Sequence, residues 1–232
     1  MNILAFDTCF DACSVAAGRQ LRSLTPSIAV AYEAMAVGHA ERLMPMIEEV
    51  MAEAGLSFGH LNRIAVTTGP GTFTGTRIAV SAARALSLAT GAPVVTLSSL
   101  HLMAMNPVVP SGRGRHIAIA TDARRDEVYF QKIDRHSLLP VTAPALVNIH
   151  DAASALGAGP IAVAGSGAEK LVAHARDQGV DAQAILPNLL PDAFDVLFAA
   201  YEFELSGAVE PLYLRPPDAK PPALGPIVGA GP

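Results

Sequence analysis

The chain has 232 residues, of which 51% are hydrophobic and 16% are charged, and its net charge is −5. A chain this apolar can bury a large core, which excludes global disorder. Its acidic balance, without a basic run, excludes a protein that holds RNA or DNA by itself, because phosphate neutralisation supplies most of such affinity.

The first hundred residues alternate between patterns typical of strands and of helices. Short apolar runs predict strands at 3–6, 13–17, 21–24, 28–32, 64–68 and 94–97. Apolar side chains at helical spacing predict helices over 41–54 and 76–89. The second helix is apolar nearly all round and has small side chains. It must therefore be covered by its own domain or by a partner, and the pattern leaves both open.

The second half repeats this alternation after a proline- and glycine-rich linker at 106–114. Strands are predicted at 116–120, 128–133 and 161–164, and helices at 168–176 and 193–205. We therefore expect two α/β lobes, over 1–106 and 107–215, with the option that the last helix packs back on the first lobe. The proline-rich tail, 216–232, is expected to be disordered.

A glycine-rich loop, Gly69–Gly75, lies between a predicted strand and a predicted helix. Such a loop can bind phosphate through backbone N–H groups, or it can be a tight turn. Asp7, at the end of the first strand, could hold Mg²⁺ or cap a turn. Gly165, after the predicted strand at 161–164, could meet a phosphate or simply turn the chain. For each of these residues, the sequence leaves open whether it binds a ligand or only shapes a turn.

The seven histidines carry information through their spacing. None has a second histidine four residues later, so the chain has no H-x-x-x-H metal helix, and His39 is followed at that distance by Leu43. A G-x-S-x-G nucleophile motif is also absent. We therefore expect no metal site, no cofactor and no catalytic apparatus of these kinds.

The expected compartment is the cytoplasm. The two cysteines, Cys9 and Cys13, are too few for a disulfide framework. The N-terminus lacks a signal-peptide pattern, and the sequence has no uninterrupted apolar run long enough to span a membrane.

Several motifs together resemble one family. They are I-L-A-F-D-T at 3–8, A-C-S-V-A at 12–16, H-A-E-R-L-M-P at 39–45, G-P-G-T-F-T-G-T-R-I at 69–78, S-S-L at 98–100, D-A-R-R-D-E-V-Y at 122–129 and Y-L-R at 213–215. Their order is similar to that of the TsaB (YeaZ) family of accessory proteins for tRNA threonylcarbamoyladenosine biosynthesis. The resemblance covers about 1–215 and is strongest over 7–100.

The resemblance implies the two-lobed, actin-like ATPase (ASKHA, ribonuclease H-like) fold. It also implies a non-catalytic scaffold that works with two partners, TsaD and the ATPase TsaE. TsaD transfers threonylcarbamoyl to N6 of adenosine 37 in tRNAs that read ANN codons. A metal-binding H-x-x-x-H of TsaD matches His39 here, with Leu43 in place of the second ligand. The chain is then expected to form a homodimer alone and to meet tRNA only through the complex.

The resemblance further implies which residues serve these contacts. The predicted interface for the homodimer and for TsaD consists of His39, Leu43, Met44, Ile47, Met51, Thr74, Arg77, Ile78, Ser81, Ala82 and Ala85. Glutamate at Ala79 or Ala83 is expected to disrupt dimerisation. A vestigial nucleotide site would involve Asp7, Thr8, Gly71 and Gly165. The alternative functions are an ASKHA-type ATPase or kinase and, less favoured, a metallopeptidase.

Overall fold

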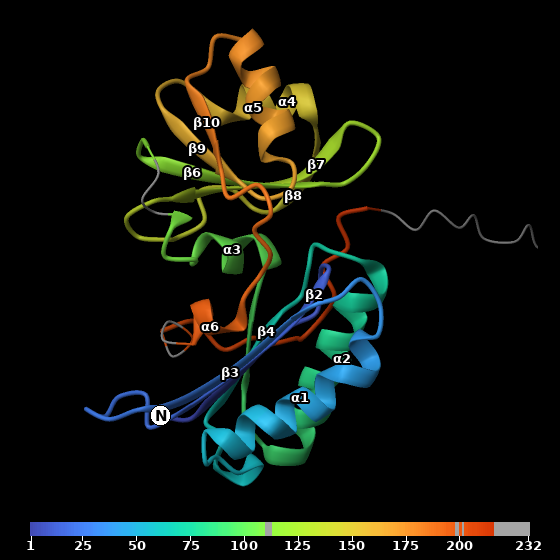
Figure 1. Ribbon diagram of the computed structural model, residues 1–232, viewed down its shortest axis with the longest axis vertical. Helices are drawn as coiled ribbons and strands as arrows, with labels where there is room; N and C mark the ends of the chain where they lie inside the picture. Colours follow the sequence, from blue (N-terminus) through green and yellow to red (C-terminus); the bar gives the residue numbers. More distant parts are fainter. Residues whose placement is uncertain (110–112, 198–199, 201, 216–232) are drawn as a thin grey trace, which may run out of the picture.

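Two lobes make up the structure, a computed structural model that describes residues 1–109, 113–197, 200 and 202–215. Each lobe contains one five-stranded sheet with helices packed against it (Figure 1). In this described part of the chain, no helix is both long enough and apolar enough to cross a membrane.

The first lobe is built on a sheet of strand order β3-β2-β1-β4-β5. Its elements are β1 (Ile3–Asp7), β2 (Ala12–Arg19), β3 (Ser27–Ala34), α1 (His39–Glu53), β4 (Arg63–Thr67), α2 (Phe73–Thr90) and β5 (Val94–Leu97). The first three strands pair antiparallel, whereas β4 and β5 add to β1 in parallel. A short helix, α3 (Ser99–Ala104), leads towards the second lobe.

The second lobe repeats this topology. Its elements are β6 (His116–Asp122), β7 (Glu127–Asp134), β8 (Ala145–Asn148), α4 (Ile149–Leu156), β9 (Ile161–Ala164), α5 (Ala168–Asp177) and β10 (Ala182–Ile185). Its sheet has the order β8-β7-β6-β9-β10, again with three antiparallel strands followed by two parallel ones. In each lobe, one helix follows the third strand along the chain and another helix follows the fourth. The predicted two-lobed α/β fold is therefore confirmed.

The sheet of the first lobe is buried on both faces because side chains alternate along each strand. Leu4 and Phe6 of β1 face the core formed with α1 and α2. Ile3 and Ala5 face the opposite core, which includes α6 (Ala193–Val196). Figure 1 shows α6 and the pair α1 and α2 on opposite sides of this sheet.

Three predicted elements differ from the observed ones. α2 begins at Phe73 rather than at residue 76, because the Thr72 hydroxyl accepts a hydrogen bond from the Gly75 N–H and so caps the helix. No strand forms at 21–24, where Leu24 lies fully exposed in a bend. The last helix covers only Ala193–Val196 of the predicted 193–205, of which positions 198, 199 and 201 lie outside the described residues.

The chain returns to the first lobe at α6. Residues 206–215, the C-terminal strap, run along β5 and α2, and the Ser206 N–H donates to the Val94 carbonyl at 2.9 Å. At the end of the strap, Arg215 reaches the second lobe and pairs with Glu127 at 2.6 Å. The described residues 193–197, 200 and 202–215 therefore pack on the first lobe, in addition to the predicted 1–106. The tail predicted to be disordered, 216–232, lies outside the described residues.

Candidate interaction surface on helix α2

The glycine-rich loop packs its backbone directly on the turn that follows β1. The Thr72 N–H donates to the Cys9 carbonyl at 2.7 Å. A Cβ on Gly71 would lie 2.2 Å from that same oxygen, and a Cβ on Gly75 would lie 1.9 Å from the Thr8 oxygen. Only glycine permits this approach. The loop thus joins two strand ends by close backbone packing, as the tight-turn interpretation predicts.

Asp7 and Thr8 are completely buried, and their polar atoms are bonded to other parts of the chain. The Thr67 hydroxyl and the Cys9 N–H donate to the two oxygens of the Asp7 carboxylate. The Thr8 hydroxyl donates to the Gly75 carbonyl at 2.7 Å. Burial raises the pKa of Asp7 to about 6, which outweighs the lowering effect of its hydrogen bonds.

This raised pKa predicts a pH-dependent stability. The native state binds the Asp7 proton more tightly than the unfolded chain, so the contribution of Asp7 is present at low pH and is lost as pH rises from about 4 to about 6. Its upper bound is about 3 kcal/mol. Asp7→Asn should flatten this part of the pH profile, as measured by urea unfolding across that range. Asp11→Asn, on the same turn but exposed, is the matched control. An unchanged profile in Asp7→Asn would contradict the assignment.

Gly165, the fourth predicted nucleotide residue, belongs to the second lobe. Its N–H donates to the Leu186 carbonyl at 3.2 Å, and a Cβ there would lie 2.5 Å from the Ala120 oxygen. Phe10, from the turn after β1, packs in an apolar cluster with second-lobe residues that include Tyr129. The structure thus brings Asp7, Thr8 and Gly71 together at one loop and gives Gly165 a separate packing role.

Burial corrects the predicted interface on α1. Leu43, Ile47 and Met51 recur every four residues and face the sheet, so all three are buried in the core of their own lobe. His39 is also buried, with Nε2 2.9 Å from the Phe10 carbonyl oxygen. None of these four side chains lies on the described surface. Met44 is the one predicted α1 residue that is exposed.

The predicted residues on α2 are distributed differently. Thr74, Arg77, Ser81 and Ala85 are exposed, whereas Ile78 and Ala82 are partly buried. Their helical spacing continues to Leu88, which is 89% exposed. Ala79 and Ala83, suggested above as interface positions, are instead fully buried in the first lobe. The name α2 surface is used for the exposed side chains of Thr74, Arg77, Ser81, Ala85 and Leu88 together with the partly buried Ile78.

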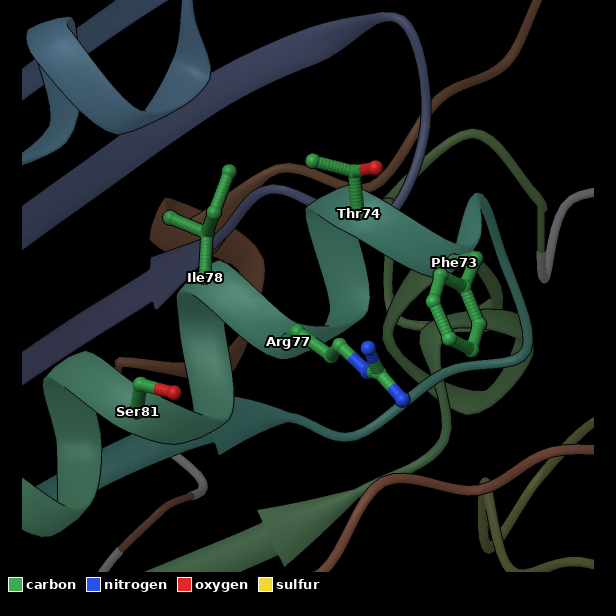
Figure 2. Close-up of a pocket in the computed structure, with 5 residues that line it drawn as sticks. All are labelled: Phe73, Thr74, Arg77, Ile78 and Ser81. Carbon is green, nitrogen blue, oxygen red and sulfur yellow. The ribbon is translucent and has the colours of Figure 1, made fainter.

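One end of the α2 surface is hollowed. Figure 2 shows the side chains that line this hollow, which has a volume of about 330 Å³. They are Phe73, Thr74, Arg77, Ile78 and Ser81. Four of these five were predicted from the sequence. Phe73 was not, although it stands inside the glycine-rich motif and is half exposed.

The C-terminal strap holds the arginines of α2. The Arg77 guanidinium lies 3.6 Å from the centroid of the Phe73 ring, and its Nε donates to the Tyr213 hydroxyl at 2.7 Å. Tyr213 in turn stacks on Phe73, with ring centroids 5.3 Å apart. Arg84 Nε donates to the Val209 carbonyl at 2.7 Å. Ring stacking and a hydrogen bond orient the Arg77 guanidinium, and a hydrogen bond orients that of Arg84.

The described residues contain no group of three or more histidine, cysteine, aspartate or glutamate side chains placed to hold a metal ion. The polar atoms of Asp7 and Thr8 and the close contacts at Gly71 occupy the junction between β1 and the glycine-rich loop. The α2 surface, which combines polar and apolar side chains, is the more accessible of the predicted features.

The duplicated topology, with three antiparallel strands followed by two parallel ones in each lobe, defines an α/β protein of the actin-like ATPase (ASKHA) type. Residues 28–203 match the family described as TsaD: tRNA N6-adenosine threonylcarbamoyltransferase. The chain belongs to the TsaB (YeaZ) family, because a TsaB protein is 30% identical to it over 93% of its length.

Three relatives illustrate this membership. The tRNA threonylcarbamoyladenosine biosynthesis protein TsaB of Escherichia coli is 30% identical over 229 residues, which cover 93% of this chain and 95% of the relative. An uncharacterized protein of Mycobacterium tuberculosis is 31% identical over 223 residues, 96% of both chains. The solved structure of YeaZ from Pseudomonas aeruginosa is 31% identical, covers 92% of this chain and 99% of that one, and has a TM-score of 0.76.

Proposed function

We propose that this chain is a non-catalytic subunit required, with TsaD and the ATPase TsaE, for threonylcarbamoyl transfer to N6 of adenosine 37 in tRNAs that read ANN codons. Membership of the family supports this role, since the Escherichia coli relative is named for threonylcarbamoyladenosine biosynthesis. The observation that carries the proposal is the exposed stripe on α2, because a rigid helix that presents apolar and small side chains to solvent is suited to docking.

The α2 surface then serves two kinds of partner in turn. Alone, the chain forms a homodimer through this surface, and TsaD displaces the second copy in the assembled complex. Contact with tRNA is left mainly to the partners, which agrees with the net charge of −5. The second copy and TsaD therefore compete, because one surface cannot bind two partners at once.

Reconstitution of the reaction tests this proposal. Purified TsaD and TsaE, supplied with threonylcarbamoyl-adenylate and tRNA, should modify the tRNA only when this chain is added. TsaD should be retained on the immobilised chain. Threonylcarbamoyl transfer by the chain alone, or full transfer without it, would refute the scaffold role.

Calorimetry with ATP tests the competing ATPase or kinase. No binding is expected, because the Asp7 carboxylate and the Thr8 hydroxyl are already bonded within the chain. Stoichiometric ATP binding that Asp7→Ala abolishes would favour an enzyme instead.

A further inference from the structure

A second cavity lies on the face of the first-lobe sheet that α6 covers. Its volume is about 470 Å³, and its walls come from β3, from the segment that links the lobes, and from the segment between β10 and α6. Tyr32 of β3 lies on the same face as Ile28, which packs in the core that includes α6, because side chains alternate along a strand. α1 and α2 cover the opposite face (Figure 1), so this cavity is separate from the α2 surface.

Apolar side chains form one wall of the cavity. Leu186, Leu189 and Leu190 line it together with Pro187 and Val108, and Val108 is 51% exposed. The backbone at Leu186 is left-handed, with a φ of 45°, and its carbonyl accepts a hydrogen bond from the Leu189 N–H at 3.0 Å. This turn gives the wall a defined shape. An apolar ligand chain that lay against it would remove these side chains from water, which is favourable.

The polar end of the cavity is the carboxylate of Asp192, which is held in one orientation. Its Oδ1 accepts hydrogen bonds from the Ser14 hydroxyl and from the Phe194 N–H, both at 3.0 Å. The Ser14 hydroxyl is itself fixed, because it accepts a hydrogen bond from the Ala193 N–H at 2.8 Å. Within the described residues, Oδ2 of Asp192 has no hydrogen bond and no ion pair. One oxygen thus positions the side chain, and the other is available to a ligand.

The carboxylate of Asp192 lies near a second one. Asp195 follows three residues later, and its side chain is hydrogen-bonded to that of Asn106, which lines the cavity. Burial raises the pKa of Asp195 to about 6, and the charge of Asp192 adds to this rise. No lysine or arginine is among the described residues that line the cavity. A bound cation would therefore offset the repulsion between the two carboxylates.

Tyr32 adds an aromatic ring to the lining. Its hydroxyl is neutral at physiological pH, since burial and then the charge of Asp192 raise its pKa. A carboxylate, an aromatic ring and an apolar wall together suit an organic cation, because the ring face attracts positive charge, and they disfavour an anion. One available carboxylate oxygen suits a compact ammonium group better than a guanidinium, which engages both oxygens.

We propose that this cavity binds a small aliphatic amine. Its ammonium group pairs with Oδ2 of Asp192 beside Tyr32, and its carbon chain lies against the leucines of 186–190. A divalent metal ion fits less well, because the described residues contain no group of three or more histidine, cysteine, aspartate or glutamate side chains placed to hold one. The inference is independent of the proposed function, since it places no partner on the α2 surface.

Titration calorimetry with hexylamine tests this site, with hexanol as the neutral ligand of the same length. Hexylamine should bind once per chain, and hexanol should bind about tenfold more weakly or worse because it forms no ion pair. Asp192→Asn should raise the hexylamine dissociation constant about tenfold or more, since the amide oxygen keeps both accepted hydrogen bonds while the charge is lost. Asp151→Asn, an exposed change on α4, is the matched control and should leave the constant unchanged. Melting temperatures check that both variants fold.

Changes at Tyr32 test the contribution of the aromatic ring. Tyr32→Phe keeps the ring, so the hexylamine dissociation constant should stay within about twofold of the wild-type value. Tyr32→Leu removes it and should raise the constant about threefold or more. Equal constants for the two variants would contradict the placement of the ammonium group beside this ring.

The remaining outcomes also decide the proposal. Absence of hexylamine binding, equal affinities for hexylamine and hexanol, or an unchanged constant in Asp192→Asn would overturn it. Nα-acetyllysine amide identifies the source of the amine. If this lysine derivative binds more tightly than hexylamine and Asp192→Asn weakens it, the same ammonium chemistry belongs to a lysine side chain of a partner protein, whereas weaker binding supports a free amine. TsaD retention and tRNA modification, measured on the wild-type chain, report separately on the proposed function.

Discussion

Gly75→Ala is expected to destabilise the first lobe by about 3 kcal/mol or more, which places it among the most damaging single changes. The new methyl carbon would lie 1.9 Å from the Thr8 carbonyl oxygen, a backbone atom that cannot move without shifting β1. It would also lie 2.7 Å from the Thr72 Oγ1 that caps α2. Urea unfolding of the purified variant measures the loss, and absence from the soluble fraction would be its extreme form.

Gly59→Ala is the matched control. Nothing lies within 4 Å of the methyl carbon that it adds, and Gly59 is exposed. A change within about 0.5 kcal/mol is expected there. Equal stabilities for the two alanine variants would show that the glycine-rich loop does not depend on close backbone packing. A phosphate-binding role of its N–H groups would then regain weight.

Glutamate at two neighbouring positions of α2 is expected to have opposite effects. Ala83 is fully buried in the first-lobe core, so Ala83→Glu leaves a carboxylate without a partner there and should cost several kcal/mol, enough to prevent folding. Ala85 is exposed, so Ala85→Glu should leave the melting temperature nearly unchanged. It should, however, abolish homodimer formation and TsaD retention by burying that charge at the interface.

Circular dichroism and size-exclusion chromatography separate the two effects. Ala89→Glu, also exposed and near the C-terminal end of the same helix, controls for added charge, and a smaller effect on association is expected. Normal association of a folded Ala85→Glu variant with both a second copy and TsaD would move the interface away from the α2 surface.

The local elements of this protein could be predicted from sequence. The strands β1, β4, β5 and β9 follow uninterrupted apolar runs, and α1 follows a clear helical period, because both patterns depend on neighbouring residues only. α3 was missed, since all six of its residues are buried and it has no polar face to mark a helical period.

The candidate surface was predicted in part. The motif at 69–78 led to Thr74, Arg77 and Ile78, but Leu88 could not be singled out in a helix that is apolar nearly all round. Tyr213 belongs to the Y-L-R motif at 213–215, but its place beside Arg77, 136 residues away in sequence, depends on how the strap folds. The resemblance placed Leu43, Ile47 and Met51 on the interface. Their spacing could not correct this, because a periodic apolar stripe fits a core and a docking face equally well.

The sequence by itself determined that this chain forms two α/β lobes, and its glycine-rich motif and histidine spacing indicated a TsaB-like protein without a metal helix. Only the tertiary structure decided which side of α2 remains in contact with solvent, where the strap lies and how Asp7 is bonded. The physical reason is that burial depends on what packs against a segment. The sheet covers Ala79 and Ala83 and leaves Ser81 and Ala85 exposed on the same helix.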